Sequence, residues 1–181
     1  MILPGKKTSL PFLFVWLLVS YACTTKKSES SAGGVTQKLR LDSVAAAIKT
    51  AADTAKNLSG CLKENNNAYR AFSFVNGDCS TCIAVVNEWK KLAEAEQLPA
   101  QSVNLIIYQA TPAKLQYLLE QAASPALMVF NDFSFSSGKA NGMHTGEPQH
   151  YLVDKDLGII EKGDLFSDPE LKKKFIVKLK P

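Results

Sequence analysis

Apolar residues recur at two different spacings along the chain after residue 65. The spacing typical of β-strands, either alternating or apolar almost throughout, occurs in several stretches. These are residues 68–75 (AYRAFSFV), 102–110 (SVNLIIYQA), 126–132 (ALMVFND) and 149–164 (QHYLVDKDLGIIEKGD), the last as two strands around a turn at 154–158. The stretch 102–110 is apolar nearly throughout, which is typical of a strand buried on both faces of a parallel sheet.

Helical spacing alternates with these strands. Residues 82–97 place Ile83, Val86, Trp89, Leu92 and Ala93 along one face of a helix. Two further helices, at 111–123 and 167–179, begin with capping signals, the first with Thr111 before Pro112. An alanine-rich amphipathic pattern over 41–58 predicts a leading helix, whereas 133–148 is expected to be a loop or broken element. The order predicts an α/β fold: a mixed central sheet with helices on both faces, preceded by an extra N-terminal helix.

The N-terminal segment has the pattern of an export signal. Lys6 and Lys7 precede the apolar run LPFLFVWLLV (10–19), which is too short for a stable membrane span and has the proportions of a secretory signal, predicted here as residues 1–22. The following SYAC, ending at Cys23, resembles the lipobox of bacterial lipoproteins, which implies lipidation of Cys23 and attachment to a membrane. The alternative is an ordinary signal peptide cut at Ala22, with Cys23 as an incidental thiol.

The rest of the chain divides into a tether and one domain. Residues 23–37 are rich in Ser, Thr, Gly and Lys, a composition that cannot form a core, so a flexible tether is expected. Residues 38–181 have the usual size of a single domain. The formal net charge is +4, of which the predicted signal carries two lysines, and the remaining +2 argues against nucleic acid as a partner.

The stretch GDCSTCIAVV (77–86) places Cys79 and Cys82 three positions apart, after a predicted strand and at the start of a predicted helix. The motif has three possible interpretations: a working dithiol, half of a metal site, or a permanent structural disulfide. A zinc site would need Cys79, Cys82, His144 and His150 together, and with a single CxxC this is a weak signal, so we expect no metal. Haem attachment would require a histidine after Cys82, where Ile83 stands. No cofactor is predicted.

Three features together resemble the thioredoxin-like fold. They are a strand that enters CxxC at a helix start, a strand–helix unit after it, and the segment EPQHYLVDKDLGIIEKG (147–163). Within this fold the chain is similar to the TlpA-like, redoxin-type exported thiol-disulfide oxidoreductases of bacteria. The resemblance implies a proline loop beside the dithiol, in which the backbone of Glu147 before Pro148 pairs with the substrate. Pro125 is the alternative for that proline, and Pro148 is preferred because the strand and turn after it fit the pattern better.

The position of the cysteines predicts their roles. A helix N-terminus favours a thiolate, so Cys79 should have a lowered pKa and attack, while Cys82, one turn later, should be more buried and resolve the mixed disulfide. The negative charge of Asp78 should raise the Cys79 pKa and oppose this effect. Cys61 is expected to be a buried or incidental thiol, and His150 a strand residue near the site rather than a catalytic base.

These observations favour an envelope-anchored thiol-disulfide oxidoreductase, held by lipid and facing the periplasm. Its partners would be exported proteins bearing thiols or disulfides and a membrane or periplasmic electron donor. The alternative is a non-enzymatic thioredoxin-fold lipoprotein that binds a partner protein and keeps the two cysteines as a structural disulfide.

Overall fold

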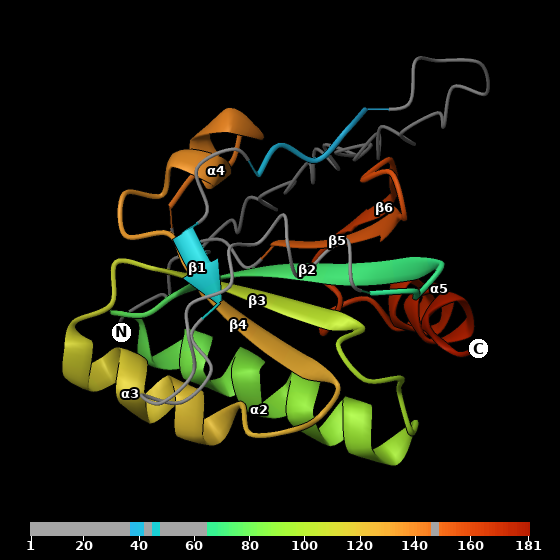
Figure 1. Cartoon of the computed structure of the whole chain (residues 1–181), viewed down its shortest axis with the longest axis horizontal. Coiled ribbons are helices and arrows are strands. Elements are labelled where there is room, and N and C mark those ends of the chain that lie inside the picture. The colour runs from blue at the N-terminus through green and yellow to red at the C-terminus, as the bar shows by residue number, and fades with distance from the viewer. Residues whose placement is uncertain (1–36, 42–44, 48–64, 146–148) are drawn as a thin grey trace, which may run out of the picture. The chain divides into compact units, whose positions relative to one another are not determined.

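A mixed β-sheet forms the centre of the domain (Figure 1). The computed structural model describes residues 37–41, 45–47, 65–145 and 149–181. Within these ranges six strands have the spatial order β1-β4-β3-β2-β5-β6. The strands are β1 (Ala45–Ala47), β2 (Tyr69–Asn76), β3 (Val103–Tyr108), β4 (Leu127–Asn131), β5 (Gln149–Asp154) and β6 (Ile159–Gly163).

Strand direction divides this sheet into two parts. Strands β2, β3 and β4 are parallel to one another, and β1, β5 and β6 each run antiparallel to a neighbour. The carboxyl ends of β2, β3 and β4 therefore lie at the same end of the sheet. The chain leaves the sheet at this end to enter α2.

Helices cover both faces of the sheet, as Figure 1 shows, with α2 and α3 on one side and α4 on the other. The helices are α2 (Ser80–Ala95), α3 (Pro112–Gln121), α4 (Ser136–Ala140) and α5 (Pro169–Leu179). Side chains of α2, α3 and α5 share one hydrophobic core with the sheet. A second core on the opposite face includes Leu39, Phe135 and Met143. The predicted α/β fold with a mixed sheet is thus confirmed.

Helices α3 and α5 begin at the capping residues that the sequence predicted. Thr111 caps α3 by accepting a hydrogen bond from the backbone N–H of Lys114, and Pro112 follows at the first helical position. Asp168 caps α5 by accepting from the N–H groups of Glu170 and Leu171. The segment expected to be a loop or broken element contains the short helix α4, whose first N–H groups donate to the buried Asp132 carboxylate.

The predicted leading helix is wrong at the residues where it can be compared. Ala45–Ala47 form strand β1, which pairs antiparallel with β4 at the edge of the sheet. An edge strand presents unpaired N–H and C=O groups, and pairing with them competes with local helix propensity. The remaining part of that predicted helix, residues 42–44 and 48–58, lies outside the described residues, as do the predicted signal (1–22), most of the tether, Cys23 and Cys61.

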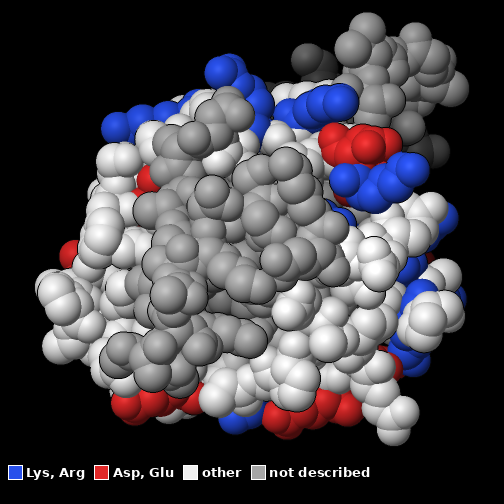
Figure 2. All heavy atoms as spheres, viewed as in Figure 1, with Lys and Arg blue, Asp and Glu red and all other residues white. Residues whose placement is uncertain are grey.

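Charges of both signs lie on the face of the molecule that Figure 2 draws. Figure 2 shows Lys and Arg together with Asp and Glu around the rim of one face. Within the described ranges, no helix combines the length and the apolar character needed to cross a membrane.

Candidate dithiol site

The two cysteines of the CxxC motif lie at the junction between β2 and α2. The turn that joins these elements is held by Asn76, whose side-chain oxygen accepts from the N–H of Asp78 at 2.9 Å. Gly77 donates its N–H to the carbonyl of Tyr108 at 2.8 Å, which ties the turn to the end of β3. A Cβ on Gly77 would collide with Ala110, so this close approach requires glycine. The turn thereby fixes the position of Cys79, the residue that follows Asp78.

Cys79 is the N-cap of α2, with an extended backbone, and its side chain is half-buried. Its sulfur lies 2.7 Å from the Thr81 hydroxyl. A thiolate at Cys79 can accept that hydroxyl proton as a hydrogen bond, and the thiol and backbone N–H of Cys82 add further donors. These hydrogen bonds, that of Thr81 first, lower the pKa of Cys79 to about 7.

Cys82 faces the core on the inner side of the same helical turn. It is buried and belongs to the same apolar cluster as Val86 and Trp89. Burial disfavours a charged sulfur, and the hydrogen bond with Cys79 adds to this, so the pKa of Cys82 is raised to about 11. The two thiols are free, one turn apart, and have opposite pKa shifts.

Asp78 forms an ion pair with helix α3. Its carboxylate oxygen lies 2.7 Å from the ammonium of Lys114, at the start of α3. The pKa of Cys79 is lowered by the hydrogen bonds of Thr81 and Cys82, and Asp78 is not among the groups that shift it. No local sequence pattern indicates this ion pair, because its members are 36 positions apart.

The histidines of the weak zinc hypothesis lie in different environments. His144 is exposed, whereas His150 on β5 is fully buried, with Nδ1 2.9 Å from the hydroxyl of Ser73. Burial lowers the pKa of His150 to about 4, with the charge of Asp164 acting in the opposite direction. In the part of the chain that the structure describes, no three His, Cys, Asp or Glu residues are grouped so as to hold a metal ion.

The strand registers separate the two candidate prolines. Pro125 lies at the amino end of β4, where its carbonyl accepts a hydrogen bond from the backbone N–H of Gln101. Because β2, β3 and β4 are parallel, this is the end of the sheet opposite to Cys79. Glu147 and Pro148 lie outside the described residues, but Gln149, which follows them, pairs with Phe74 near the carboxyl end of β2. No cis peptide bond occurs among the described residues.

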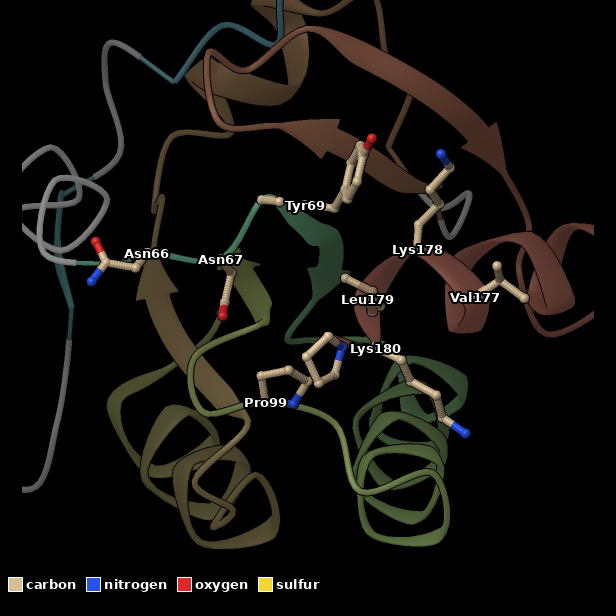
Figure 3. Close-up of a pocket in the computed structure, with 10 residues that line it drawn as sticks. Asn66, Asn67, Tyr69, Pro99, Val177, Lys178, Leu179 and Lys180 are labelled. Atoms are coloured by element: carbon tan, nitrogen blue, oxygen red, sulfur yellow. The ribbon is translucent and has the colours of Figure 1, made fainter.

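A cavity of about 560 Å³ lies away from the dithiol (Figure 3). Its lining includes Tyr69, Pro99, Lys178 and Leu179, and Lys178 stands over the Tyr69 ring at 4.9 Å from the ring centroid. Tyr69 is the first residue of β2, whereas Cys79 lies beyond the other end of this strand. The cavity therefore contributes no side chain to the dithiol site.

Comparison with known proteins identifies the architecture. No family model matches the chain, and no curated protein matches its sequence. Among solved structures, it is similar to the thioredoxin domain of a thiol-disulfide oxidoreductase from Bacteroides vulgatus, with 13% identity, a TM-score of 0.52 and coverage of 81% of this chain and 98% of that chain.

Two further solved structures are similar to it. A hypothetical protein from Sinorhizobium meliloti 1021 has 15% identity, a TM-score of 0.50 and coverage of 73% and 72% of the two chains. A thiol-disulfide oxidoreductase from Bacteroides fragilis has 16% identity, a TM-score of 0.47 and coverage of 62% and 82%. At such identities the likeness concerns the fold, and the described residues of this chain have a thioredoxin-like fold.

Proposed function

We propose that this protein is a thiol-disulfide oxidoreductase that uses Cys79 and Cys82 as its dithiol. The contrast between the two sulfurs carries the proposal: Cys79 is half-exposed with a pKa of about 7, and Cys82 is buried with a pKa of about 11. A thiolate is the attacking species in disulfide exchange, so Cys79 is the sulfur able to attack at neutral pH. The thioredoxin domain of the Bacteroides vulgatus enzyme has the same fold, so the scaffold is compatible with this activity.

The reaction proceeds in two exchanges. The Cys79 thiolate attacks one sulfur of a partner's disulfide, a mixed disulfide forms, and the other partner sulfur leaves as a thiolate. Cys82 then loses its proton to the solvent and attacks the Cys79 sulfur, which releases the second partner thiolate and closes the Cys79–Cys82 disulfide. The partner gains two electrons and the dithiol loses two. An electron donor of the membrane or periplasm returns the pair to the dithiol form.

The substrate is proposed to lie against the loop that contains Glu147 and Pro148. The pairing of Gln149 with Phe74 supports this, because it brings the start of β5 to the end of the sheet at which the chain enters α2. In this proposal the backbone of Glu147 hydrogen-bonds to the partner's peptide, and the partner's disulfide lies over Cys79.

The protein is proposed to act in the bacterial cell envelope on exported proteins that bear thiols or disulfides. The support is the apolar run at 10–19, the SYAC sequence and the polar tether. Lipid on Cys23 would hold the domain at the membrane surface. Fractionation of cells that express wild type and Cys23→Ala tests this: wild type should be in the membrane fraction with lipid mass on Cys23, and the variant should be released. A soluble wild type without lipid would contradict the anchor.

Trapping of mixed disulfides tests the activity. Cys82→Ser should accumulate disulfide-linked complexes through Cys79, because the resolving attack is lost. Cys79→Ser is the matched control and should trap little and lose disulfide reductase activity. Absence of complexes with Cys82→Ser, combined with no reductase activity of the wild type, would contradict the enzyme and favour the partner-binding lipoprotein.

A further inference from the structure

An ion pair joins the turn before the dithiol to helix α3. The Lys114 ammonium lies 2.7 Å from the Asp78 carboxylate, and their side chains are 47% and 56% exposed. Asp78 directly precedes Cys79. A change at Lys114 therefore acts on the carboxylate of the residue that precedes Cys79 in the chain.

The position of Lys114 is defined by the start of its helix. Its backbone N–H donates to the Thr111 hydroxyl at 3.4 Å, and Pro112 fixes the backbone of the first turn of α3. The backbone of Asp78 is held by the Asn76 side chain. Since both backbones are fixed, the two side chains meet without rearrangement of either element.

A carboxylate beside a thiol opposes formation of the thiolate, because two negative charges repel. A cation paired with that carboxylate offsets the repulsion. The groups that act on the Cys79 thiol are Thr81 and Cys82 on its own helix. Asp78 stands in the preceding turn and pairs with Lys114 of α3. Glu147, expected in the neighbouring loop, lies outside the described residues.

We propose that Lys114 is a positioning residue of the dithiol, which pairs with the Asp78 carboxylate and so preserves the thiolate of Cys79. The proposal rests on the proposed function in taking Cys79 as the attacking sulfur. Lys114 acts on that sulfur only through Asp78. Its effect is small, because both side chains are largely exposed and salt screens such pairs.

The test is a double-mutant cycle in the full reduced chain, with Lys114→Gln, Asp78→Asn and the double variant. The rate of carboxamidomethylation of Cys79 by iodoacetamide is measured from pH 5 to 9 by tandem mass spectrometry, whose fragment ions separate Cys79 from Cys82 on the same peptide. Lys114→Gln should move the midpoint to higher pH and slow the reaction about two- to threefold at pH 6 and low salt. In the Asp78→Asn background the same substitution should change little.

A matched control is Lys91→Gln, which breaks the exposed ion pair between Lys91 and Glu88 on α2, at 3.1 Å, and leaves the Asp78 pair intact. It should not move the midpoint. The shift from Lys114→Gln should shrink in 1 M salt. An unchanged midpoint for Lys114→Gln, or an equal shift in the Asp78→Asn background, overturns the proposal.

This readout is separate from disulfide exchange. If Cys82→Ser traps no partner while the cycle shows coupling between Asp78 and Lys114, the proposed function fails and the role of Lys114 stands. If complexes are trapped and the cycle shows no coupling, the function stands and Lys114 is an ordinary surface residue.

Discussion

The outer and inner sides of the first turn of α2 give the same chemical group opposite properties. On the outer side, Cys79 meets the hydroxyl of Thr81, and its pKa falls to about 7. On the inner side, Cys82 faces the core that holds Trp89, and its pKa rises to about 11. Three positions along a helix thus separate a sulfur whose thiolate is favoured from one whose thiolate is disfavoured. The spacing of the motif brings the sulfurs together, and their exposure to water and hydrogen-bond donors decides which one ionises more easily.

The inner side also holds a histidine in its neutral form. His150 has rings of Trp89 and Phe166 at centroid distances of 5.8 and 5.2 Å, and its Nε2 has no hydrogen-bond partner among the described residues. Burial therefore disfavours the charged forms of both Cys82 and His150. Four predictions test how far the two sides differ, from the largest expected effect to the smallest.

The largest expected effect is the difference in alkylation rate between the two cysteines. At pH 7 about half of Cys79 is ionised, whereas only about one Cys82 in ten thousand is, given pKa values of about 7 and 11. Iodoacetamide should therefore modify Cys79 in Cys82→Ser at least about a thousandfold faster than Cys82 in Cys79→Ser. Peptide mass spectrometry of both reduced variants measures the rates. Comparable rates would show that the two sides of the turn are equivalent.

The second prediction concerns acid stability through His150. The folded pKa of about 4 is below the unfolded value of 6.5, so the contribution of the neutral ring to stability is complete above pH 6.5 and is lost as pH falls from 6.5 to 4. The shift corresponds to about 3 kcal/mol in the free energy of unfolding. Urea denaturation at pH 7 and pH 4 measures it. His150→Gln should remove this part of the pH dependence, and His144→Gln, at the exposed histidine, should retain it. Equal pH dependence in all three proteins would contradict the assignment to His150.

The third prediction concerns Gly77, where the chain passes from the buried strand to the exposed turn. The methyl group of Gly77→Ala would collide with the side chain and backbone of Ala110. Overpacking of this kind should cost about 1–3 kcal/mol of the free energy of unfolding. Urea denaturation compares the variant with wild type, and the double variant Gly77→Ala, Ala110→Gly should recover part of the loss. A variant as stable as wild type would mean that the turn moves away from β3 at little cost.

The smallest of the four effects is expected from the hydroxyl beside Cys79. Thr81→Val keeps the shape of the side chain but removes the hydroxyl whose hydrogen bond contributes most to the lowered pKa of Cys79. The pKa should rise by about one unit, and alkylation at pH 6 should slow up to about tenfold. Ser80→Ala is the control, since Ser80 is exposed and has no side-chain hydrogen bond within the described ranges. If both variants leave the pH profile unchanged, the Thr81 hydroxyl does not stabilise the thiolate.

Most of the fold could be predicted because each element carries a local signal. Strand β3 is apolar at nearly every position, and α3 begins at a threonine and proline that satisfy or omit the unpaired N–H groups of a first turn. Ala45–Ala47 had no such unique signal. Alanine favours a helix in isolation, and only the open edge of β4 decides for a strand.

The sequence by itself determined that two cysteines meet at a strand–helix junction, with the first at the helix N-terminus and the second on the apolar face. Those are properties of spacing, since residues three apart lie one turn apart. Tertiary structure decided the rest of the site. The pairing of Asp78 with Lys114 depends on how distant segments pack, and so does the location of Pro125 at the end of the sheet opposite to Cys79. Burial of His150 depends on the helices that cover its strand, and no local pattern encodes that environment.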